Sequence, residues 1–161
     1  GISIYDFGEL LKLPLDKFNL VQLPLSVYDQ RALHKGWIKY LKDRNIDVHI
    51  RSVFLQGLIL QHPSLWPNKI NSKFRNHHVN FLNFCNQNNL SLIENALNFA
   101  NNLKDVEAIL IGISEYNELF QILKIWDEIS QNKALIQMNY QNWAWNNYDD
   151  LDPRNWKKVI K

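Results

Sequence analysis

The amino-acid sequence predicts an α/β fold in which four β-α units build a parallel sheet. Short apolar runs alternate with longer amphipathic stretches, which is typical of strands connected by crossover helices. The chain has 161 residues, of which 46% are hydrophobic, and this is enough to bury the core of one domain. No repeat or low-complexity linker divides residues 1–161, so we expect one structural unit.

The four apolar runs are the expected strands. They are Ile2–Tyr5, Leu20–Leu23, Ile46–Ile50 and Ala108–Ile111. A short helix is expected over Phe7–Lys12, after the first strand. After the second strand, apolar residues recur at spacings of three and four between Leu33 and Leu41, which predicts one amphipathic helix over Asp29–Arg44.

A longer segment separates the third and fourth strands. Pro63, Pro67 and the polar residues 68–72 indicate a surface loop. Ser91 and Glu94 have the spacing of a capping box, which predicts a helix start at this point. The expected helices are Phe74–Phe84, Leu92–Leu103 and, after the fourth strand, Tyr116–Ile129.

Residues 137–161 form a tail rich in aromatic side chains, with a turn at Asp152-Pro153. Trp143, Trp145, Tyr148 and Trp156 could form a carbohydrate or base-stacking surface. Aromatic residues serve more often in core and interface packing, so we expect the tail to pack onto the sheet and its helices.

Composition excludes several classes of partner. The net charge is +2, with basic and acidic residues spread along the chain, so neither nucleic acid nor an anionic membrane is expected. No apolar run is long enough to cross a bilayer, and no basic-then-apolar leader opens the chain. The single cysteine, Cys85, excludes an internal disulfide, and a cytoplasmic location is expected.

No metal site is predicted. The adjacent residues His77 and His78 would point about 100° apart on a helix, which does not suit one shared metal ion. We expect them to form a surface pair. The other histidines have no cysteine or carboxylate at ligand spacing.

Polar or small residues stand where the expected strands end, at positions where apolar core residues would be more usual. They are Ser3, Gln22, Arg51, Ser52, Gly112 and Ser114. The carboxyl ends of parallel strands lie at one edge of a sheet, and binding sites form there. These residues are therefore the candidate site.

The same stretches resemble the aldo-keto reductases. Val21–Arg31 is similar to the sixth barrel strand of that family, Ile50–Leu60 to the seventh strand and its loop, and Leu110–Ser114 to the eighth. Gly1–Ile4 then corresponds to the fifth. The resemblance implies the C-terminal half of a (β/α)₈ TIM barrel, strands 5 to 8, with extra C-terminal helices. Because the chain opens without a methionine on an apparent buried strand, we expect a fragment.

The resemblance also implies a nicotinamide-dinucleotide site. Ser3 and Gln22 would hold the carboxamide, although Gln22 could instead be satisfied by backbone groups. Arg51 stands where most of the family has an aromatic residue that stacks on the nicotinamide. A guanidinium can stack, but its charge would also suit a phosphate of the cofactor or an anionic substrate.

The remaining cofactor contacts follow the third and fourth strands. By the resemblance, Ser52, Phe54 and Gln56 would wrap the pyrophosphate; an ordinary β-α loop is the alternative, because no glycine-rich phosphate motif is present. Gly112 and Glu118 stand where members that prefer NADPH have a cation. Ser114 lies nearby, and Gln121 would contact the adenine. Because Gly112 and Glu118 provide no positive charge for a 2′-phosphate, the resemblance slightly favours NADH over NADPH.

The catalytic residues of the family come from the first four strands, so none is assigned here, and Tyr5, Tyr28 and His49 are not substitutes. The expected function is part of an NAD(P)H-dependent oxidoreductase that reduces a carbonyl or oxidises an alcohol. The tail Asp152–Trp156 resembles a branch found among surface-sugar biosynthesis enzymes, which hints at a sugar-related substrate.

Two alternatives remain open. The chain could be a non-catalytic half-barrel that pairs with a second copy of itself and acts as a dinucleotide-binding or interaction module, since closure would remove the sheet edges. It could also belong to another barrel superfamily with the same β-α rhythm, because this architecture supports unrelated chemistries.

Overall fold

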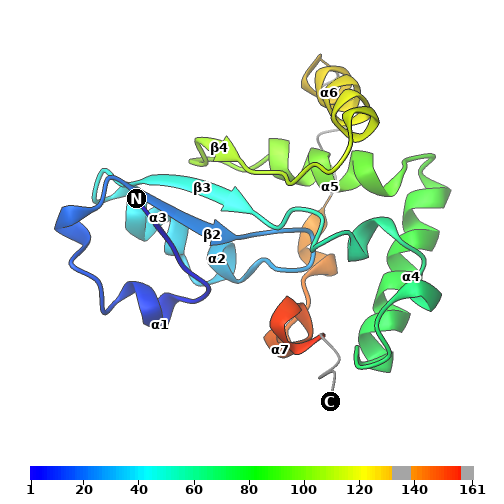
Figure 1. The fold of residues 1–161 in the computed structure, drawn as a ribbon, viewed down its shortest axis with the longest axis horizontal. Coiled ribbons are helices and arrows are strands. Elements are labelled where there is room, and N and C mark those ends of the chain that lie inside the picture. Colours follow the sequence, from blue (N-terminus) through cyan, green and yellow to red (C-terminus); the bar gives the residue numbers. More distant parts are fainter. Residues whose placement is uncertain (132–138, 157–161) are drawn as a thin grey trace.

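A parallel four-stranded sheet is the centre of the computed structural model, which describes residues 1–131 and 139–156 (Figure 1). Its strands are β1 (Ile2–Ser3), β2 (Leu20–Pro24), β3 (Asp47–Arg51) and β4 (Ala108–Ile109), in the order β1-β2-β3-β4. Every neighbouring pair is parallel. The predicted α/β class with four parallel strands is confirmed, although β1 and β4 are shorter than expected.

The two faces of the sheet differ in chemistry. Val21 and Leu23 of β2 and Val48 and Ile50 of β3 are fully buried, on the face that α2 (Arg31–His34) and α3 (Trp37–Lys42) cover. The alternate residues form the open face. In register across that face lie Ser3, Gln22, His49 and Ala108. Parallel sheets are normally covered on both faces, so this polar open face is unusual and is accessible to a ligand or a further layer.

The expected helix over Asp29–Arg44 is wrong, because two short helices occupy this segment. α2 ends at His34, and α3 begins at Trp37 after Gly36, whose φ of 69° is left-handed. A left-handed residue interrupts the α-helical hydrogen-bond ladder, and glycine adopts this conformation without a Cβ penalty. The first helix, α1 (Phe7–Leu10), is also shorter than predicted.

The helices of the longer connection agree with the prediction. α4 covers Ser72–Gln87 and α5 covers Leu92–Asn101. The predicted capping box is present, since the Ser91 hydroxyl accepts from the Glu94 amide and the Glu94 carboxylate accepts from the Ser91 amide. Short 3₁₀ turns at Leu58–Leu60 and Pro63–Leu65 occupy the loop before α4.

His78 contradicts the expected surface pair. Its side chain is fully buried on α4, where the Tyr28 hydroxyl hydrogen-bonds to its Nδ1 atom and its Nε2 atom donates to the Gln61 carbonyl over 2.9 Å. His77 is half-buried and packs against Trp145 and Trp143. The two rings do point in different directions, but both belong to an aromatic layer rather than to the surface.

The part of the aromatic tail that the structure describes, residues 139–156, packs onto the rest of the molecule. Trp145 stacks on Phe74 of α4 with the ring centroids 5.0 Å apart, and its backbone amide donates to the Tyr28 carbonyl over 2.8 Å. The Gln30 side chain donates to the Tyr140 carbonyl over 2.7 Å. The helix α7 (Tyr148–Leu151) follows, while residues 137–138 and 157–161 of the tail lie outside the described part.

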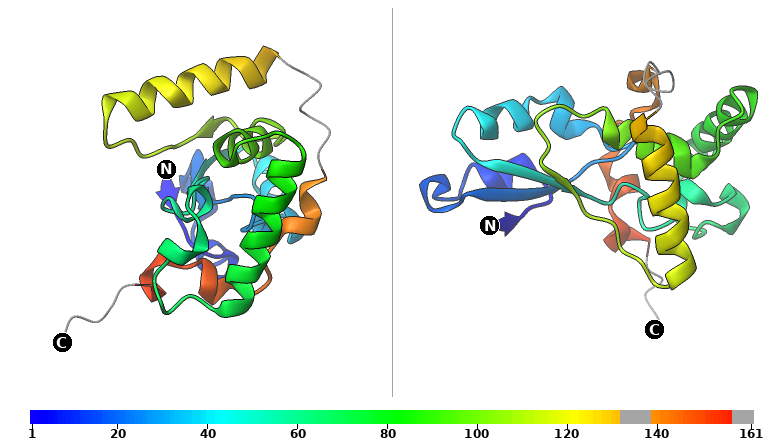
Figure 2. Two further views of the ribbon diagram at one scale, coloured as in Figure 1. Left: turned by 90° about the vertical axis from the view of Figure 1, so that its right-hand side faces the viewer. Right: turned by 90° about the horizontal axis from the view of Figure 1, so that it is seen from above.

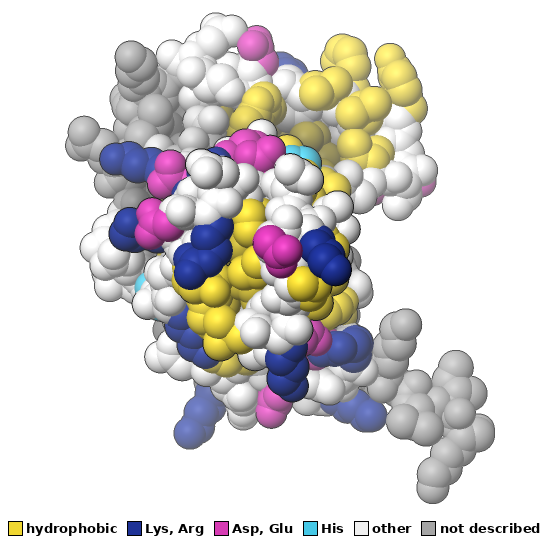
Figure 3. Space-filling model, turned by 90° about the vertical axis from the view of Figure 1, so that its left-hand side faces the viewer, with side chains coloured by type: hydrophobic (Ala, Val, Ile, Leu, Met, Phe, Trp, Pro, Cys, Tyr) yellow, Lys and Arg dark blue, Asp and Glu magenta, His cyan; other side chains and the backbone are white. Residues whose placement is uncertain are grey.

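α6 (Tyr116–Gln131) is the least buried helix of the described chain. It runs beside α5 at the periphery of the molecule (Figure 2), and only Ile129 among its residues is buried. Large apolar side chains on α6 and in the segment between β4 and α6 are exposed, and Figure 3 shows them gathered over α6. We call these residues the α6 apolar face: Leu110, Ile113, Tyr116, Phe120 and Leu123.

Across the described ranges, no helix combines the length and apolar character needed to cross a membrane.

Candidate functional site

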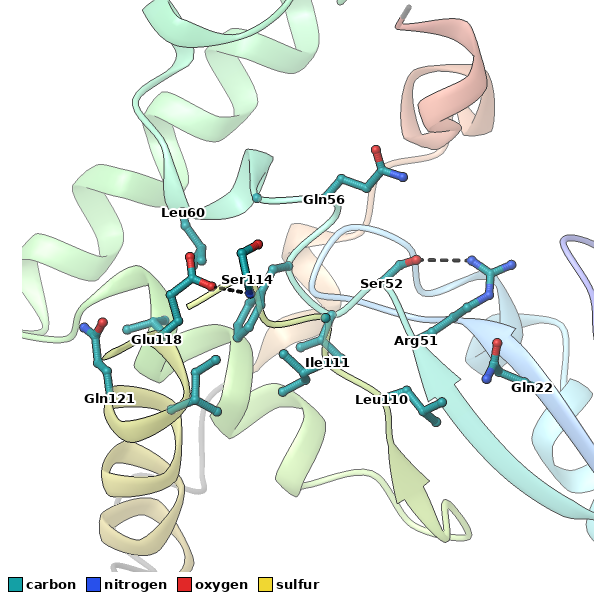
Figure 4. A pocket seen from close by; sticks show the side chains of 16 residues that line it. Gln22, Arg51, Ser52, Gln56, Leu60, Leu110, Ile111, Ser114, Glu118 and Gln121 are labelled. Carbon is teal, nitrogen blue, oxygen red and sulfur yellow. Dashed lines mark hydrogen bonds between the residues drawn. The ribbon is translucent and has the colours of Figure 1, made fainter. Parts of the chain in front are cut away.

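A cavity of about 780 Å³ opens where β2 and β3 end and where the chain leaves β4 (Figure 4). Its volume lies within the usual range for ligand pockets. Nine of the ten predicted site residues line it: Gln22, Arg51, Ser52, Phe54, Gln56, Gly112, Ser114, Glu118 and Gln121. The tenth, Ser3, donates a hydrogen bond to Gln22 from the neighbouring strand. The structure therefore brings together residues that are up to 118 positions apart, from Ser3 to Gln121.

These side chains are arranged along the cavity in three groups (Figure 4). Gln22, within β2, and Arg51, at the end of β3, lie at one end of the cavity. Ser52 and Gln56 lie in the middle, on the loop after β3. Ser114, Glu118 and Gln121 lie at the opposite end, in the chain that enters α6 and on its first turns.

The β2 end of the cavity contains a connected set of hydrogen bonds. Arg51 Nε donates to the Ser3 hydroxyl over 3.3 Å, and that hydroxyl donates to Gln22 Oε1 over 3.0 Å. The Gln22 amide oxygen is thereby engaged. Its Nε2 group makes no bond to any described residue and remains a donor for a ligand.

Arg51 is held on several sides by neutral groups. One terminal nitrogen donates to the Ser52 hydroxyl and the other to the Ile4 carbonyl, each over 3.2 Å. Its guanidinium lies over the Tyr5 ring, 4.4 Å from the centroid. Within the described residues no carboxylate is in ion-pair distance of it. The site therefore presents an oriented, half-buried cation to the cavity.

The loop after β3 has an unusual backbone. Ser52, Leu55 and Gln56 have φ values of 63°, 48° and 51°, and Gly57 follows at 85°. Left-handed conformations are costly for residues other than glycine and occur where a structure positions a ligand-binding backbone. In the described chain the amides of Val53, Phe54 and Gln56 have no protein acceptor. Free amides of this kind suit phosphate oxygens.

Glu118 has a structural role that the sequence interpretation missed. Its Oε2 atom accepts from the backbone amides of Ser114 and Glu115, over 2.8 and 3.3 Å, and so caps the start of α6. The spacing of Glu115 and Glu118 could have indicated this cap. The other carboxylate oxygen makes no hydrogen bond within the described part and is the one a ligand could use.

The apolar wall of the cavity was also missed. It consists of side chains from the loop after β3, from α5, from the segment after β4 and from α6: Val53, Leu60, Ile93, Leu110, Ile111 and Ile122. Nothing in their sequence pattern separates them from ordinary core residues. An apolar wall opposite a few polar groups is typical of cofactor sites.

The side chains with strongly displaced pKa values lie in the helical layer and do not line the cavity. Burial lowers the pKa of the His78 imidazole to about 4 and raises the pKa of the Cys85 thiol to about 12. No group of three or more His, Cys, Asp or Glu side chains among residues 1–131 and 139–156 could hold a metal ion. The described cavity offers groups that bind and orient, without a tuned acid–base pair.

The sequence matches no protein-family model and no curated protein. The functional conclusion therefore depends on the residues of the cavity and on their arrangement.

Proposed function

We propose that this chain provides the cofactor-binding part of an NAD(P)H-dependent oxidoreductase of the aldo-keto reductase type. The observation that carries the proposal is the grouping of nine predicted cofactor residues along one cavity. Their order, from Gln22 through Ser52 to Gln121, is the order in which an extended dinucleotide would present its nicotinamide, pyrophosphate and adenosine. The sequential strand order of the sheet places the three groups along the cavity in their order in the chain.

The donor set supports the fit. The Gln22 amide group can bind the carboxamide oxygen, and the free amides of the loop after β3 can bind phosphate oxygens. The dinucleotide, when bound, supplies the hydride. The chain's own residues hold and orient it, while the wall that includes Ile93 and Ile122 excludes water.

In this proposal the sheet is half of a (β/α)₈ barrel, and four further strands complete it. Those strands would carry the acid–base residues for carbonyl reduction or alcohol oxidation, with a sugar-related compound as the substrate. The open polar face and the unpaired outer strands β1 and β4 agree with a sheet that is completed by other strands.

The adenosine end favours NADH over NADPH. Glu118 lies there, and no lysine or arginine of the described chain lines that end of the cavity. A carboxylate can accept hydrogen bonds from a ribose diol, but it repels a 2′-phosphate.

We expect NADH to bind more tightly than NADPH, by about tenfold, when energy transfer from the tryptophans to each reduced cofactor is measured. Glu118→Gln should reduce this preference severalfold, because the repelling charge is removed. Glu115→Gln is the matched control, since it removes an exposed charge from the same turn without lining the cavity. Failure of both cofactors to bind a folded chain would contradict the proposal.

A second candidate is a self-associating half-barrel without redox chemistry. The exposure of the α6 apolar face favours it, since Tyr116 is 76% exposed and Phe120 is 63% exposed. Two copies could pair β4 of one with β1 of the other and close eight strands around a shared axis.

A further inference from the structure

The environment of Arg51 contains neutral acceptors and a second cation, and the carboxylate whose charge reaches it, Asp29, is already paired with Arg31. Three of its five N–H groups donate to Ser3, Ser52 and the Ile4 carbonyl, so two remain for a ligand. A half-buried cation whose hydrogen-bond acceptors are all neutral, and whose nearby carboxylate is paired with another arginine, is incompletely stabilised. An anion bound at this end of the cavity would stabilise the Arg51 charge and accept from its free N–H groups.

Arg154 provides an internal comparison. It lies over the same Tyr5 ring, 4.1 Å from the centroid, but its guanidinium is paired with Asp152, with Nε 2.9 Å from each carboxylate oxygen. Asp29, the carboxylate near the start of α2, is paired with Arg31 over 2.8 Å. Arg154 and Asp29 therefore each have a partner of opposite charge within ion-pair distance. Among the described residues, Arg51 has no such partner.

Gln22 also favours an anion at this end of the cavity. The Ser3 hydroxyl occupies its Oε1 atom, so the amide presents its NH₂ group to the ligand. Arg51, at the end of β3, and Gln22, in the adjacent strand β2, together offer donors to the same end of the cavity. Such a set is complementary to an oxyanion, and a guanidinium binds carboxylate and phosphate groups in a forked geometry.

We infer that the β2 end of the cavity is an oxyanion site, in which Arg51 and one of the two Nε2 hydrogens of Gln22 bind a carboxylate or phosphate group, while the other hydrogen stays available for the cofactor carboxamide. The inference rests on the proposed function and specifies its substrate: the anion is a group of the substrate, held beside the reacting carbon, because the loop after β3 already offers its own amides to the pyrophosphate. The cofactor pyrophosphate is the other source of the same chemistry.

The test is a titration of the ¹⁵N-labelled chain with inorganic phosphate at constant ionic strength, followed through the arginine Nε–H resonances. We expect a saturable shift of the Arg51 resonance with a dissociation constant of roughly millimolar size. Arg51→Gln should weaken phosphate binding at least tenfold, measured through the Gln22 side-chain amide. Arg51→Lys, which keeps the charge, should weaken it less. Arg154→Gln is the matched control and should leave the affinity within twofold.

Repeating the phosphate titration with saturating NADH distinguishes the two sources of the anion, the substrate and the cofactor pyrophosphate. If phosphate still binds, the anion belongs to the substrate; if NADH displaces it and Arg51→Gln weakens NADH, the site serves the pyrophosphate. Phosphate binding without any NADH binding would keep the oxyanion site and reject the proposed function. Absence of a saturable shift in the folded wild-type chain, or equal phosphate binding by Arg51→Gln, would overturn the inference.

Discussion

His78 and Tyr28 show how single side chains hold the helical layer against the sheet. The neutral imidazole uses both nitrogens, one toward the Tyr28 hydroxyl and one toward the Gln61 carbonyl. The Tyr28 ring also makes edge contacts with Phe74 and Phe81. Protonation of Nδ1 would require the Tyr28 hydroxyl to change from donor to acceptor, and burial makes the charge of the imidazolium unfavourable.

This pair predicts a pH dependence of stability. Burial lowers the pKa of His78 from 6.5 to about 4, so the unfolded chain binds a proton that the folded chain does not between these values. Stability is therefore full above pH 6.5 and falls toward pH 4. We expect the free energy of unfolding in urea to drop by about 1 kcal/mol between pH 7.5 and pH 5.5.

His78→Gln isolates this contribution, because it removes the titrating group while other groups remain. Asp29, whose pKa burial raises, is common to both proteins and cancels in the comparison. The variant should lose less than half as much stability over the same interval. An equally steep loss in the variant would show that another group is responsible.

At the scale of the elements, Gly36 decides how the polypeptide between β2 and β3 is divided. Its φ of 69° ends α2 and starts α3, and no atom lies within 4 Å of the position that a Cβ would occupy. The requirement for glycine is thus conformational and not steric.

Gly36→Ala should destabilise the protein by about 1 kcal/mol, the cost of a left-handed alanine. Gly112→Ala is the control, because the space beside Gly112 is equally open and its backbone needs no positive φ. It should change the free energy of unfolding by less than about 0.5 kcal/mol. Equal thermal or urea midpoints for the two variants would refute this assignment.

The elements themselves were largely predictable. The four apolar runs became the four strands, and the Ser91–Glu94 spacing located the start of α5, because both signals are local. The break at Gly36 was missed because apolar periodicity continues across it, and periodicity does not report φ. The burial of His78 was missed because it depends on α4 facing Tyr28, which is 50 residues away.

For the whole molecule, the site was predictable to the extent that parallel strands share an edge. Gln22, Arg51 and Gly112 therefore line one cavity. The hydrogen bonds from Arg51 to Ser3 and Ile4 were not predictable, since they need the register of β1 against its neighbours and the loop that follows it. The capping bonds of Glu118 depend on local backbone geometry in the same way.

The α6 apolar face leads us to predict that the chain self-associates. Exposed apolar side chains gathered on a helix and on the segment before it indicate an interaction surface, so we expect the chain to sediment as a concentration-dependent dimer. Phe120→Asp should shift it to the monomer by placing a charge in the contact. Ser130→Asp, on the same helix but outside the apolar face, should not change the dissociation constant. A wild-type chain that remains monomeric at all concentrations would eliminate self-association.

The tail contacts have a consequence for the order of events during synthesis. Tyr140 and Trp145 supply backbone partners for Gln30 and Tyr28, which leave the ribosome more than 100 residues earlier. Gln30 and Tyr28, in the loop after β2, therefore lack these two protein partners until the residues up to Tyr140 and Trp145 have been translated. The strands β1 to β3 can pair before that, but the helical layer gains these two contacts only after Tyr140 and Trp145 have emerged, so its apolar surface stays exposed until then.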